Sequence, residues 1–181
     1  TLDGKTALLN GKSQWITGPA ARQDVQKLRA RSCAILTGSG TVLVDNPQLT
    51  VRTGDTSLQP LRVVLDSRLV TPPERRIFDG GNTLLATSVA DPARHEVYRQ
   101  RGAQLLILPA VGGHADLELL LHSLAERGVN ELMVEAGAGL NGALVQAGLV
   151  DEIILYLAPA LVGNAAQGLF AWPALEDLAG E

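Results

Sequence analysis

Cysteine is almost absent from this chain of 181 residues, which contains only Cys33. One cysteine cannot form a disulfide within the chain or supply a zinc site built from several thiolates, so nothing here requires an oxidising compartment. The sequence also lacks an apolar run long enough to span a bilayer and any signal-peptide pattern. We therefore expect a cytoplasmic protein that does not contact membranes.

Aromatic residues and basic charge are also scarce. Aromatics make up 3% of the chain and hydrophobic residues 46%, so the core must consist mainly of aliphatic side chains. The formal net charge of -4 argues against a nucleic-acid partner, although it is compatible with a local pocket for one phosphate. The length fits a single domain over residues 1–181. Because the chain begins at Thr1 rather than Met, we expect it to be a fragment of a longer protein.

Apolar runs of strand length alternate with segments of helical period. The predicted buried strands are 33–37, 61–66, 83–87, 104–108, 131–135 and 151–157. The predicted helices are 19–31, 91–101, 116–127 and 140–147. The first begins at a proline, and the other three stop before a glycine. This alternation predicts an α/β fold with a largely parallel central sheet and helices on both faces.

The strongest local motif is a G-x-G-x-x-G sequence formed by Gly137, Gly139 and Gly142, directly after the strand at 131–135. Glycines at a strand-to-helix turn let the backbone approach a pyrophosphate, and the helix N-terminus offers unpaired N–H groups. The alternative is a tight turn with close helix packing. A Rossmann domain is disfavoured because its motif belongs to the first βα unit and needs an acidic residue after the next strand. Here Asp151 and Glu152 stand at that strand's beginning.

Two further clusters are candidate ligand sites. Trp15 stands in a polar loop before a helix, where it either packs as a cap or presents a flat face to a ring. Residues 37–52 (TGSGTVLVDNPQLTVR) follow a buried strand, the place where open α/β sheets bind ligands. The Asp45-Asn46-Pro47 step is also ordinary turn chemistry, and that reading competes with a functional one.

Six runs in a fixed order make the sequence similar to the reductase domain of the bacterial bifunctional riboflavin-biosynthesis deaminase-reductase. The runs are LDGKTA, SQWIT, TGSGTVLVDNPQLTVR, VLDS, VEAG and GLVDE. The resemblance extends from Thr1 to about Gly168. It implies the dihydrofolate-reductase-like fold, and it implies reduction of 5-amino-6-(5-phosphoribosylamino)uracil to the ribitylamino product with NADPH as cofactor and without a metal.

The same resemblance assigns roles to particular residues. Substrate contacts fall on Ser13, Arg29, Leu49, Arg52 and Glu135. NADPH contacts fall on Trp15, Thr41, Asp45, Ser67, Gly137, Ala138, Gly139, Leu140, Asn141, Gly142 and Ala143. Arginine suits a phosphate because its planar fork donates two parallel hydrogen bonds, although Arg29 could instead lie on a solvated helix face. Asp45 is the candidate catalytic proton donor, with bulk water as the alternative.

The family's zinc deaminase domain carries H-x-E and P-C-x-x-C motifs, which one cysteine cannot supply. We therefore expect a covalently linked deaminase domain in the full-length protein, outside this chain. The resemblance also implies a homodimer. Two alternatives are left open. One is another dihydrofolate-reductase-like reductase of a pyrimidine or pterin, and the other is a nucleotide-binding or assembly module without chemistry.

Overall fold

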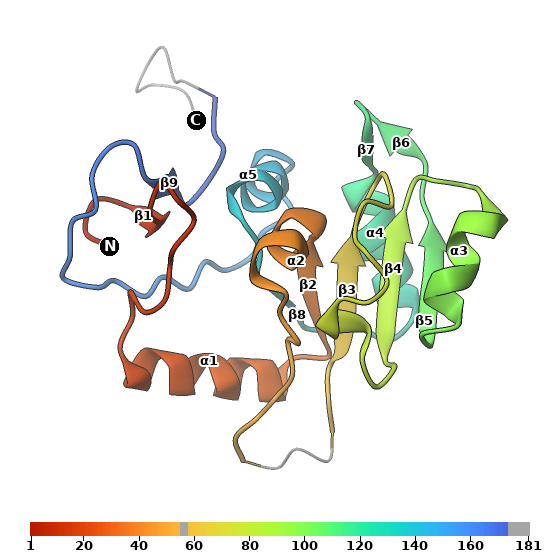
Figure 1. Cartoon of the computed structure of the whole chain (residues 1–181), viewed down its shortest axis with the longest axis horizontal. Coiled ribbons are helices and arrows are strands. Elements are labelled where there is room, and N and C mark those ends of the chain that lie inside the picture. Colours follow the sequence, from red (N-terminus) through yellow and green to blue (C-terminus); the bar gives the residue numbers. More distant parts are fainter. Residues whose placement is uncertain (55–57, 174–181) are drawn as a thin grey trace. The chain divides into compact units, whose positions relative to one another are not determined.

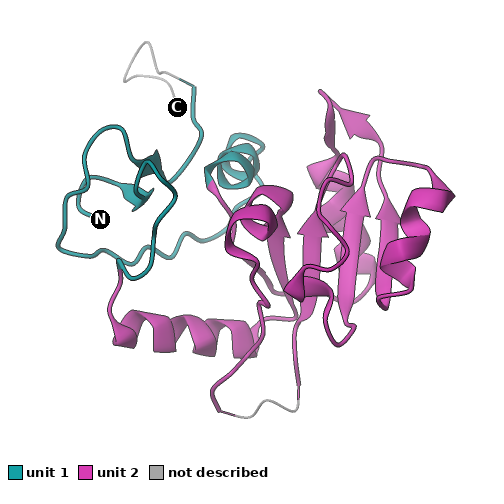
Figure 2. Ribbon diagram, in the orientation of Figure 1, with its two compact units in different colours: residues 1–16, 138–181 teal, residues 17–137 magenta. Residues whose placement is uncertain are grey.

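The computed structural model describes residues 1–54 and 58–173, and the chain divides into two compact units (Figure 2). Unit 2 is the continuous segment Thr17–Gly137, whereas unit 1 combines Thr1–Ile16 with Ala138–Glu181. In the part of the chain that is described, no helix has the length and apolar character needed to cross a membrane.

Unit 2 is built on a five-stranded sheet in the order β5-β4-β3-β2-β8 (Figure 1). The strands are β2 (Ala34–Gly38), β3 (Leu61–Leu65), β4 (Thr83–Thr87), β5 (Ala103–Ile107) and β8 (Leu132–Val134). Every pairing in this sheet is parallel. The first four strands are neighbours in chain order, and the chain then returns to place β8 on the other side of β2.

Four helices belong to unit 2: α1 (Pro19–Arg31), α2 (Ser39–Asp45), α3 (Pro92–Arg99) and α4 (Leu117–Glu126). The α3 connection steps outward from β4 to β5, and the α4 connection steps back from β5 to β8. Parallel crossovers are right-handed, so these opposite steps put the two helices on opposite faces of the sheet. Figure 1 shows α4 behind the strands. The predicted α/β fold with helices on both faces is confirmed.

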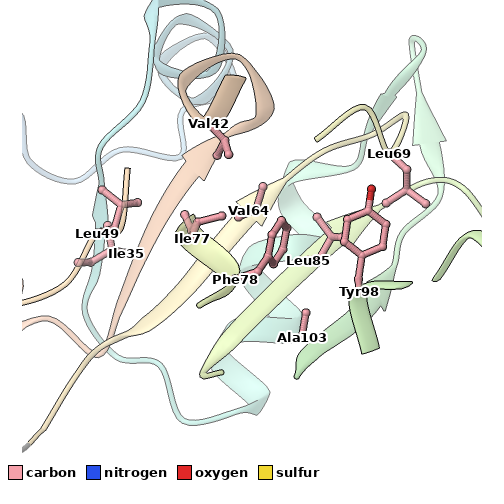
Figure 3. Close-up of a cluster of buried hydrophobic side chains, with 10 residues drawn as sticks. All are labelled: Ile35, Val42, Leu49, Val64, Leu69, Ile77, Phe78, Leu85, Tyr98 and Ala103. Carbon is pink, nitrogen blue, oxygen red and sulfur yellow. The ribbon is translucent and has the colours of Figure 1, made fainter. Parts of the chain in front are cut away.

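One face of the sheet carries a continuous hydrophobic cluster (Figure 3). Strand residues Ile35, Val64 and Leu85 pack there with Ile77 and Phe78, which come from the short 3-10 helix η1 (Arg76–Phe78). The Phe78 ring meets that of Tyr98 on α3 at 5.5 Å between centroids. The strands therefore contribute aliphatic side chains to this cluster, since alternate residues of a strand face the same side of the sheet. This agrees with the small number of aromatic residues in the chain.

A small hairpin completes unit 2, in which β6 (Ala110–Val111) pairs antiparallel with β7 (His114–Ala115). In unit 1, β1 (Lys5–Ala7) pairs antiparallel with β9 (Gln167–Gly168). Asp3 stabilises this pairing, because its Oδ2 accepts hydrogen bonds from the N–H groups of Val162 at 2.9 Å and Gly163 at 2.8 Å. Unit 1 also contains α5 (Ala138–Gln146).

The expected strand at 151–157 is wrong. This segment has no regular secondary structure, and most of its residues are exposed. An apolar run becomes a strand only when a neighbour pairs its N–H and C=O groups, and no strand lies against it in the ranges 1–54 and 58–173. The other predicted strands lie within two residues of their observed bounds, and α5 begins at Ala138 rather than at Leu140.

The structure contains a helix, α2, that was not predicted from the sequence. Its sequence SGTVLVD combines glycine with β-branched residues, which have low helix propensity. Packing supplies the stabilisation instead, because Val42 is fully buried in the hydrophobic cluster. Asn46 ends the helix in the left-handed conformation at φ 43°, and its N–H donates to the Val42 carbonyl. A short helix of this kind is set by tertiary contacts rather than by local sequence.

Candidate active site

The carboxyl ends of β8, β2 and β3 are adjacent in the sheet of unit 2. Between β8 and β2 the strand order departs from chain order, and open α/β sheets bind ligands at such a switch point. The segments that follow these three strands carry Glu135 and Gly137, then Thr41 and Asp45, and then Ser67. Most of the residues that sequence analysis singled out in unit 2 therefore emerge at one end of the sheet.

Arg29 and Glu135 form a two-point ion pair. Arg29 Nε donates to Glu135 Oε1 at 2.6 Å, and Nη2 donates to Oε2 at 2.7 Å. Glu135 is fixed beside β2, because its N–H donates to the Leu36 carbonyl at 2.9 Å. Arg29 is only 8% exposed, so the alternative of a solvated helix face is excluded. Two of the five expected substrate-binding residues are therefore bonded to each other.

The same arginine also holds the segment of residues 49–52. Its Nη1 donates to the Thr50 carbonyl at 3.0 Å. The N–H of Arg52 donates to Gln26 Oε1 at 2.8 Å, while the Arg52 side chain is exposed. The Leu49 side chain is buried in the hydrophobic cluster, and its backbone has a positive φ of 50°. The Leu49 side chain therefore belongs to the core and is not available for a ligand.

Thr41 and Gly137 are neighbours at the ends of β2 and β8. A Cβ added to Gly137 would lie 3.7 Å from Thr41 Oγ1, an ordinary contact that leaves little room for a larger side chain. Gly137 is the last residue of unit 2, and α5 begins at the next residue. Within unit 2, a threonine hydroxyl and a glycine therefore meet where two adjacent strands end.

Asp45 is the last residue of α2. Its side chain is exposed at the surface, and partial desolvation by the neighbouring chain raises the pKa of its carboxyl, because removal from water disfavours the charged form. A carboxyl with a raised pKa keeps its proton at higher pH. This property is what a general acid requires.

Ser67 begins a tight turn after β3. Its Oγ accepts a hydrogen bond from the Ala115 N–H at 2.8 Å, so the hydroxyl still has its proton to donate. The turn is held by Asp66, whose Oδ2 accepts from the Thr71 N–H at 2.7 Å. Arg94 on α3 donates to the carbonyls of Arg68 and Leu69, each at 3.0 Å. The turn is therefore rigid, and it presents the exposed Arg68 side chain.

The remaining expected contacts lie in unit 1. Ser13 is half-buried, and its carbonyl accepts from the Ile16 N–H at 2.9 Å. Trp15 is 70% exposed, which favours a flat face open to a ring over a packed cap. Within α5, Leu140, Asn141 and Ala143 are half-buried.

The glycines of the G-x-G-x-x-G motif have different structural roles. A Cβ on Gly142 would collide with the Ala171 carbonyl oxygen, so close packing of the chain explains this glycine. A Cβ on Gly139 would meet nothing within 4 Å, and packing does not require a glycine there. Close packing therefore accounts for Gly142, whereas phosphate binding at Gly139 stays a prediction.

Sequence analysis did not identify two residues that bind the 49–52 segment of unit 2. Gln26 is buried on α1 and Gln59 precedes β3, and both bind the backbone of residues 51–52. A single glutamine has no recognisable pattern, although Gln26 and Arg29 are three residues apart and so share one helix face. Among the residues that the structure describes, no group of three or more His, Cys, Asp or Glu side chains is arranged to hold a metal.

Comparison with known proteins identifies the family of the chain. Residues 1–177 match the family model described as "RibD C-terminal domain". The riboflavin biosynthesis protein RibD of Escherichia coli is 45% identical over 99% of the chain, which covers 51% of that relative. The structure of Acinetobacter baumannii RibD (form 1) matches 100% of the chain and 49% of its own length, with TM-score 0.87 and 38% identity.

A more distant structure has the same fold. It is the Thermotoga maritima diaminohydroxyphosphoribosylaminopyrimidine deaminase/5-amino-6-(5-phosphoribosylamino)uracil reductase, with TM-score 0.75, 26% identity, and coverage of 99% of this chain and 48% of that one. The chain thus spans about half the length of the relatives it matches. The family match over nearly all its residues and the fold shared with these RibD structures lead to one assignment: the chain belongs to the RibD C-terminal domain family.

Proposed function

We propose that this chain is an NADPH-dependent reductase that converts 5-amino-6-(5-phosphoribosylamino)uracil into its ribitylamino product in riboflavin biosynthesis. The observation that carries the proposal is the set of hydrogen bonds by which Arg29 joins Glu135, after β8, to the 49–52 segment. Family membership supports it. So does the reductase activity named for the Thermotoga maritima relative.

The substrate side of the proposal uses charge and hydrogen bonding. A phosphorylated ribosylaminouracil presents a dianion, sugar hydroxyls and uracil N–H groups. Arg52, with its exposed guanidinium, supplies charge for the phosphate. Three of the five N–H groups of Arg29 donate to Glu135 and the Thr50 carbonyl. We assign the remaining two to the substrate. Glu135 accepts from sugar or uracil donors, and the Leu49 backbone and Ser13 complete the assigned contacts.

The residues present fit NADPH. The first turn of α5, formed by Ala138, Gly139 and Leu140, has backbone N–H groups without helical partners, and the open space around Gly139 permits close approach of an anion. Thr41 and Ser67 add neutral hydroxyls, and Arg68 adds a guanidinium for a 2′-phosphate. Trp15 offers a flat aromatic face. When bound, NADPH supplies a hydride to the sugar.

Reduction opens the sugar ring. The C1′–O4′ bond would break, C1′ would gain the hydride that bound NADPH supplies, and O4′ would gain a proton to become a hydroxyl. We assign the proton to the Asp45 carboxyl, because its raised pKa keeps it protonated at higher pH than an ordinary aspartate. The chain's own residues otherwise bind and orient the reactants.

The proposal includes the setting of the reaction. NADPH and a sugar phosphate are charged and do not cross bilayers, which supports a cytoplasmic location. Relatives about twice as long as this chain support a linked deaminase domain in the full-length protein. We also propose a homodimer, which light scattering of the full-length protein would test.

The decisive experiment is an NADPH oxidation assay with the full-length protein and 5-amino-6-(5-phosphoribosylamino)uracil. We expect substrate-dependent loss of absorbance at the nicotinamide band and formation of the ribitylamino product. Oxidation with a pterin or an unphosphorylated pyrimidine, but not with this substrate, would favour the alternative reductase. Cofactor binding without oxidation by any of them would favour a module without chemistry.

A further inference from the structure

We propose that Gln26 and Gln59 are positioning residues, which fix the backbone of residues 50–52 and thereby aim Arg52 at the substrate's phosphate. The inference rests on the proposed function, since it concerns the same site. Neither glutamine is assumed to touch substrate or cofactor. Both act through the segment that carries Arg52.

The observation behind this inference is that residues 50–52 belong to no strand, yet four of their backbone groups are paired by side chains. Arg29 binds the Thr50 carbonyl. Gln59 binds both the N–H and the carbonyl of Val51, at 2.8 Å and 3.1 Å. Gln26 binds the Arg52 N–H at 2.8 Å. Side chains therefore supply the pairing that a neighbouring strand would normally give.

Gln26 acts from inside the fold. It is 7% exposed and stands one helical turn before Arg29 on α1, so the two side chains share one face of the helix. That face is polar at both positions, and each of the two side chains bonds to the 50–52 backbone. A helix face that only packed against the segment would be expected to carry apolar residues at these buried positions. The polar pair instead specifies where the segment lies.

Gln59 binds the same segment through the backbone of Val51. Its amide group imitates a strand neighbour, since the oxygen accepts from the Val51 N–H and the nitrogen donates to the Val51 carbonyl. Gln59 is itself anchored, because Asn82 Nδ2 donates to the carbonyls of Gln59 and Pro60 at 3.2 Å and 3.1 Å. Asn82 immediately precedes β4. The sheet thus holds Gln59, and Gln59 holds Val51.

The consequence for the site concerns the direction of one side chain. Val51 is buried and Arg52 is exposed, so the backbone at these two residues decides which way Arg52 points. Loss of either glutamine would let the 50–52 segment shift while Arg52 itself stays intact. A misplacement on the order of 1 Å is enough to weaken a positioned contact substantially.

The test uses methionine substitutions, which keep the length of glutamine but remove its hydrogen bonds. Gln26→Met and Gln59→Met would be made in the full-length protein, with Gln23→Met as the control because Gln23 is exposed on the same helix. The measurements are KM and kcat for the phosphorylated substrate, the Kd of NADPH from fluorescence titration, the Kd of ribose 5-phosphate from calorimetry, and the thermal midpoint.

We expect Gln26→Met and Gln59→Met each to raise KM for the substrate and Kd for ribose 5-phosphate by about fivefold or more. The NADPH Kd should stay within about twofold of the unmodified value, and Gln23→Met should change nothing. A purely structural role predicts a different pattern. Destabilisation lowers the active fraction, and hence the apparent kcat, but it does not change KM.

Unchanged KM and unchanged ribose 5-phosphate affinity in both variants would overturn the inference while leaving the proposed function standing. A lower thermal midpoint with unchanged KM would also overturn it. An unmodified protein that neither turns over the substrate nor binds ribose 5-phosphate would overturn the proposed function and the inference together. If turnover fails but ribose 5-phosphate binds and both variants weaken it, the positioning role stands and the proposed reaction does not.

Discussion

Arg29 and Glu135 are 106 residues apart in the sequence, and their side chains meet through two hydrogen bonds of 2.6 Å and 2.7 Å. Their side chains are 10% and 22% exposed, so water screens the pair only weakly. The pair connects α1 to the end of β8, and the third bond of Arg29 adds the 49–52 segment. One arginine therefore sets the geometry of three separate parts of unit 2.

We expect this ion pair to stabilise the fold measurably. Arg29→Met or Glu135→Leu alone should lower the free energy of unfolding by about 2 kcal/mol, because each leaves a partly buried charge without its partner. The double variant should lose less than the sum of the two. Urea denaturation of the four proteins in a double-mutant cycle gives the coupling directly.

The matched control connects nearly the same elements on the surface. Arg31 Nε lies 3.0 Å from Glu131 Oε1, with side chains 57% and 49% exposed. Arg31→Met should cost less than about 1 kcal/mol, since exposed ion pairs contribute little. Equal losses for Arg29→Met and Arg31→Met would contradict the expectation.

The glycine motif gives a second prediction, in which two glycines differ in effect. Gly139→Val should weaken NADPH binding at least tenfold, about 1.4 kcal/mol, and leave the protein folded, because a Cβ at this position has nothing within 4 Å. Gly142→Ala should instead destabilise the fold by about 1–3 kcal/mol, because its Cβ collides with the Ala171 carbonyl. Fluorescence titration and thermal unfolding of both variants measure the two effects. NADPH affinity unchanged in a folded Gly139→Val protein would remove the motif from the cofactor site.

A third prediction concerns the choice between NADPH and NADH. Arg68 is exposed on a turn that Arg94, Asp66 and Tyr98 hold in place. Arg68→Ala should lower the NADPH-to-NADH ratio of kcat/KM about tenfold, about 1.4 kcal/mol, because the 2′-phosphate loses a guanidinium. Arg99→Ala, on the exposed surface of α3, is the control and should leave the ratio unchanged. Equal kcat/KM for both cofactors in the unmodified protein would show the NADPH assignment to be wrong.

The sequence predicts those helices and strands that neighbouring residues alone specify. Helix α1 begins at Pro19 and ends at Arg31 as predicted, because proline at a first-turn position and a polar helical period are local signals. Strands buried on both faces appear as apolar runs, as β4 does. The run at 151–157 contains a similar apolar stretch, but no described strand pairs with it. Pairing depends on distant residues, and no local pattern reports it.

The position of the candidate site could also be predicted from local signals, because motifs that follow parallel strands collect at one end of a sheet. The hydrogen bonds and packing contacts within the site could not be predicted. Nothing local in the sequence shows that Arg29 faces Glu135 rather than solvent, that Gln26 is buried, or that Gly142 touches Ala171. These contacts join residues far apart in the chain, and they appear only once the sheet order is known.

The fourth prediction tests Asp45 through pH. If its carboxyl donates the proton, kcat should fall as pH rises through its pKa, because only the protonated form can act as an acid. Burial raises that pKa, so this decline should lie above the pH range of an ordinary aspartate. Asp45→Asn should lower kcat and abolish this limb of the profile.

Stability of the same variant provides a separate measurement. A raised pKa in the folded state means that ionised Asp45 destabilises the fold, and this cost appears as pH rises through the folded pKa. Asp45→Asn should therefore unfold at the same or a slightly higher temperature at neutral pH. An identical pH profile of kcat in Asp45→Asn and the unmodified protein would leave bulk water as the proton source.

The last prediction separates the roles of the two arginines at the substrate's phosphate. Arg52 is exposed, whereas Arg29 is paired with Glu135, so most of the free positive charge comes from Arg52. Arg52→Ala should raise KM for the phosphorylated substrate about tenfold or more and lower kcat, because the phosphate also orients C1′. The NADPH Kd should hardly change. Arg52→Lys should recover only part of the loss, since lysine keeps the charge but not the planar fork.

Arg29→Ala should behave differently, with a rise in KM accompanied by a lower free energy of unfolding, because it disrupts the ion pair and the 49–52 segment together. Steady-state kinetics and urea denaturation on the three variants distinguish these patterns. An unphosphorylated substrate provides the internal control: Arg52→Ala should not change its kcat/KM, because it has no phosphate to lose. If Arg52→Ala keeps the unmodified KM for the phosphorylated substrate, the phosphate must bind elsewhere, and the helix N-terminus at Ala138 becomes the next position to test.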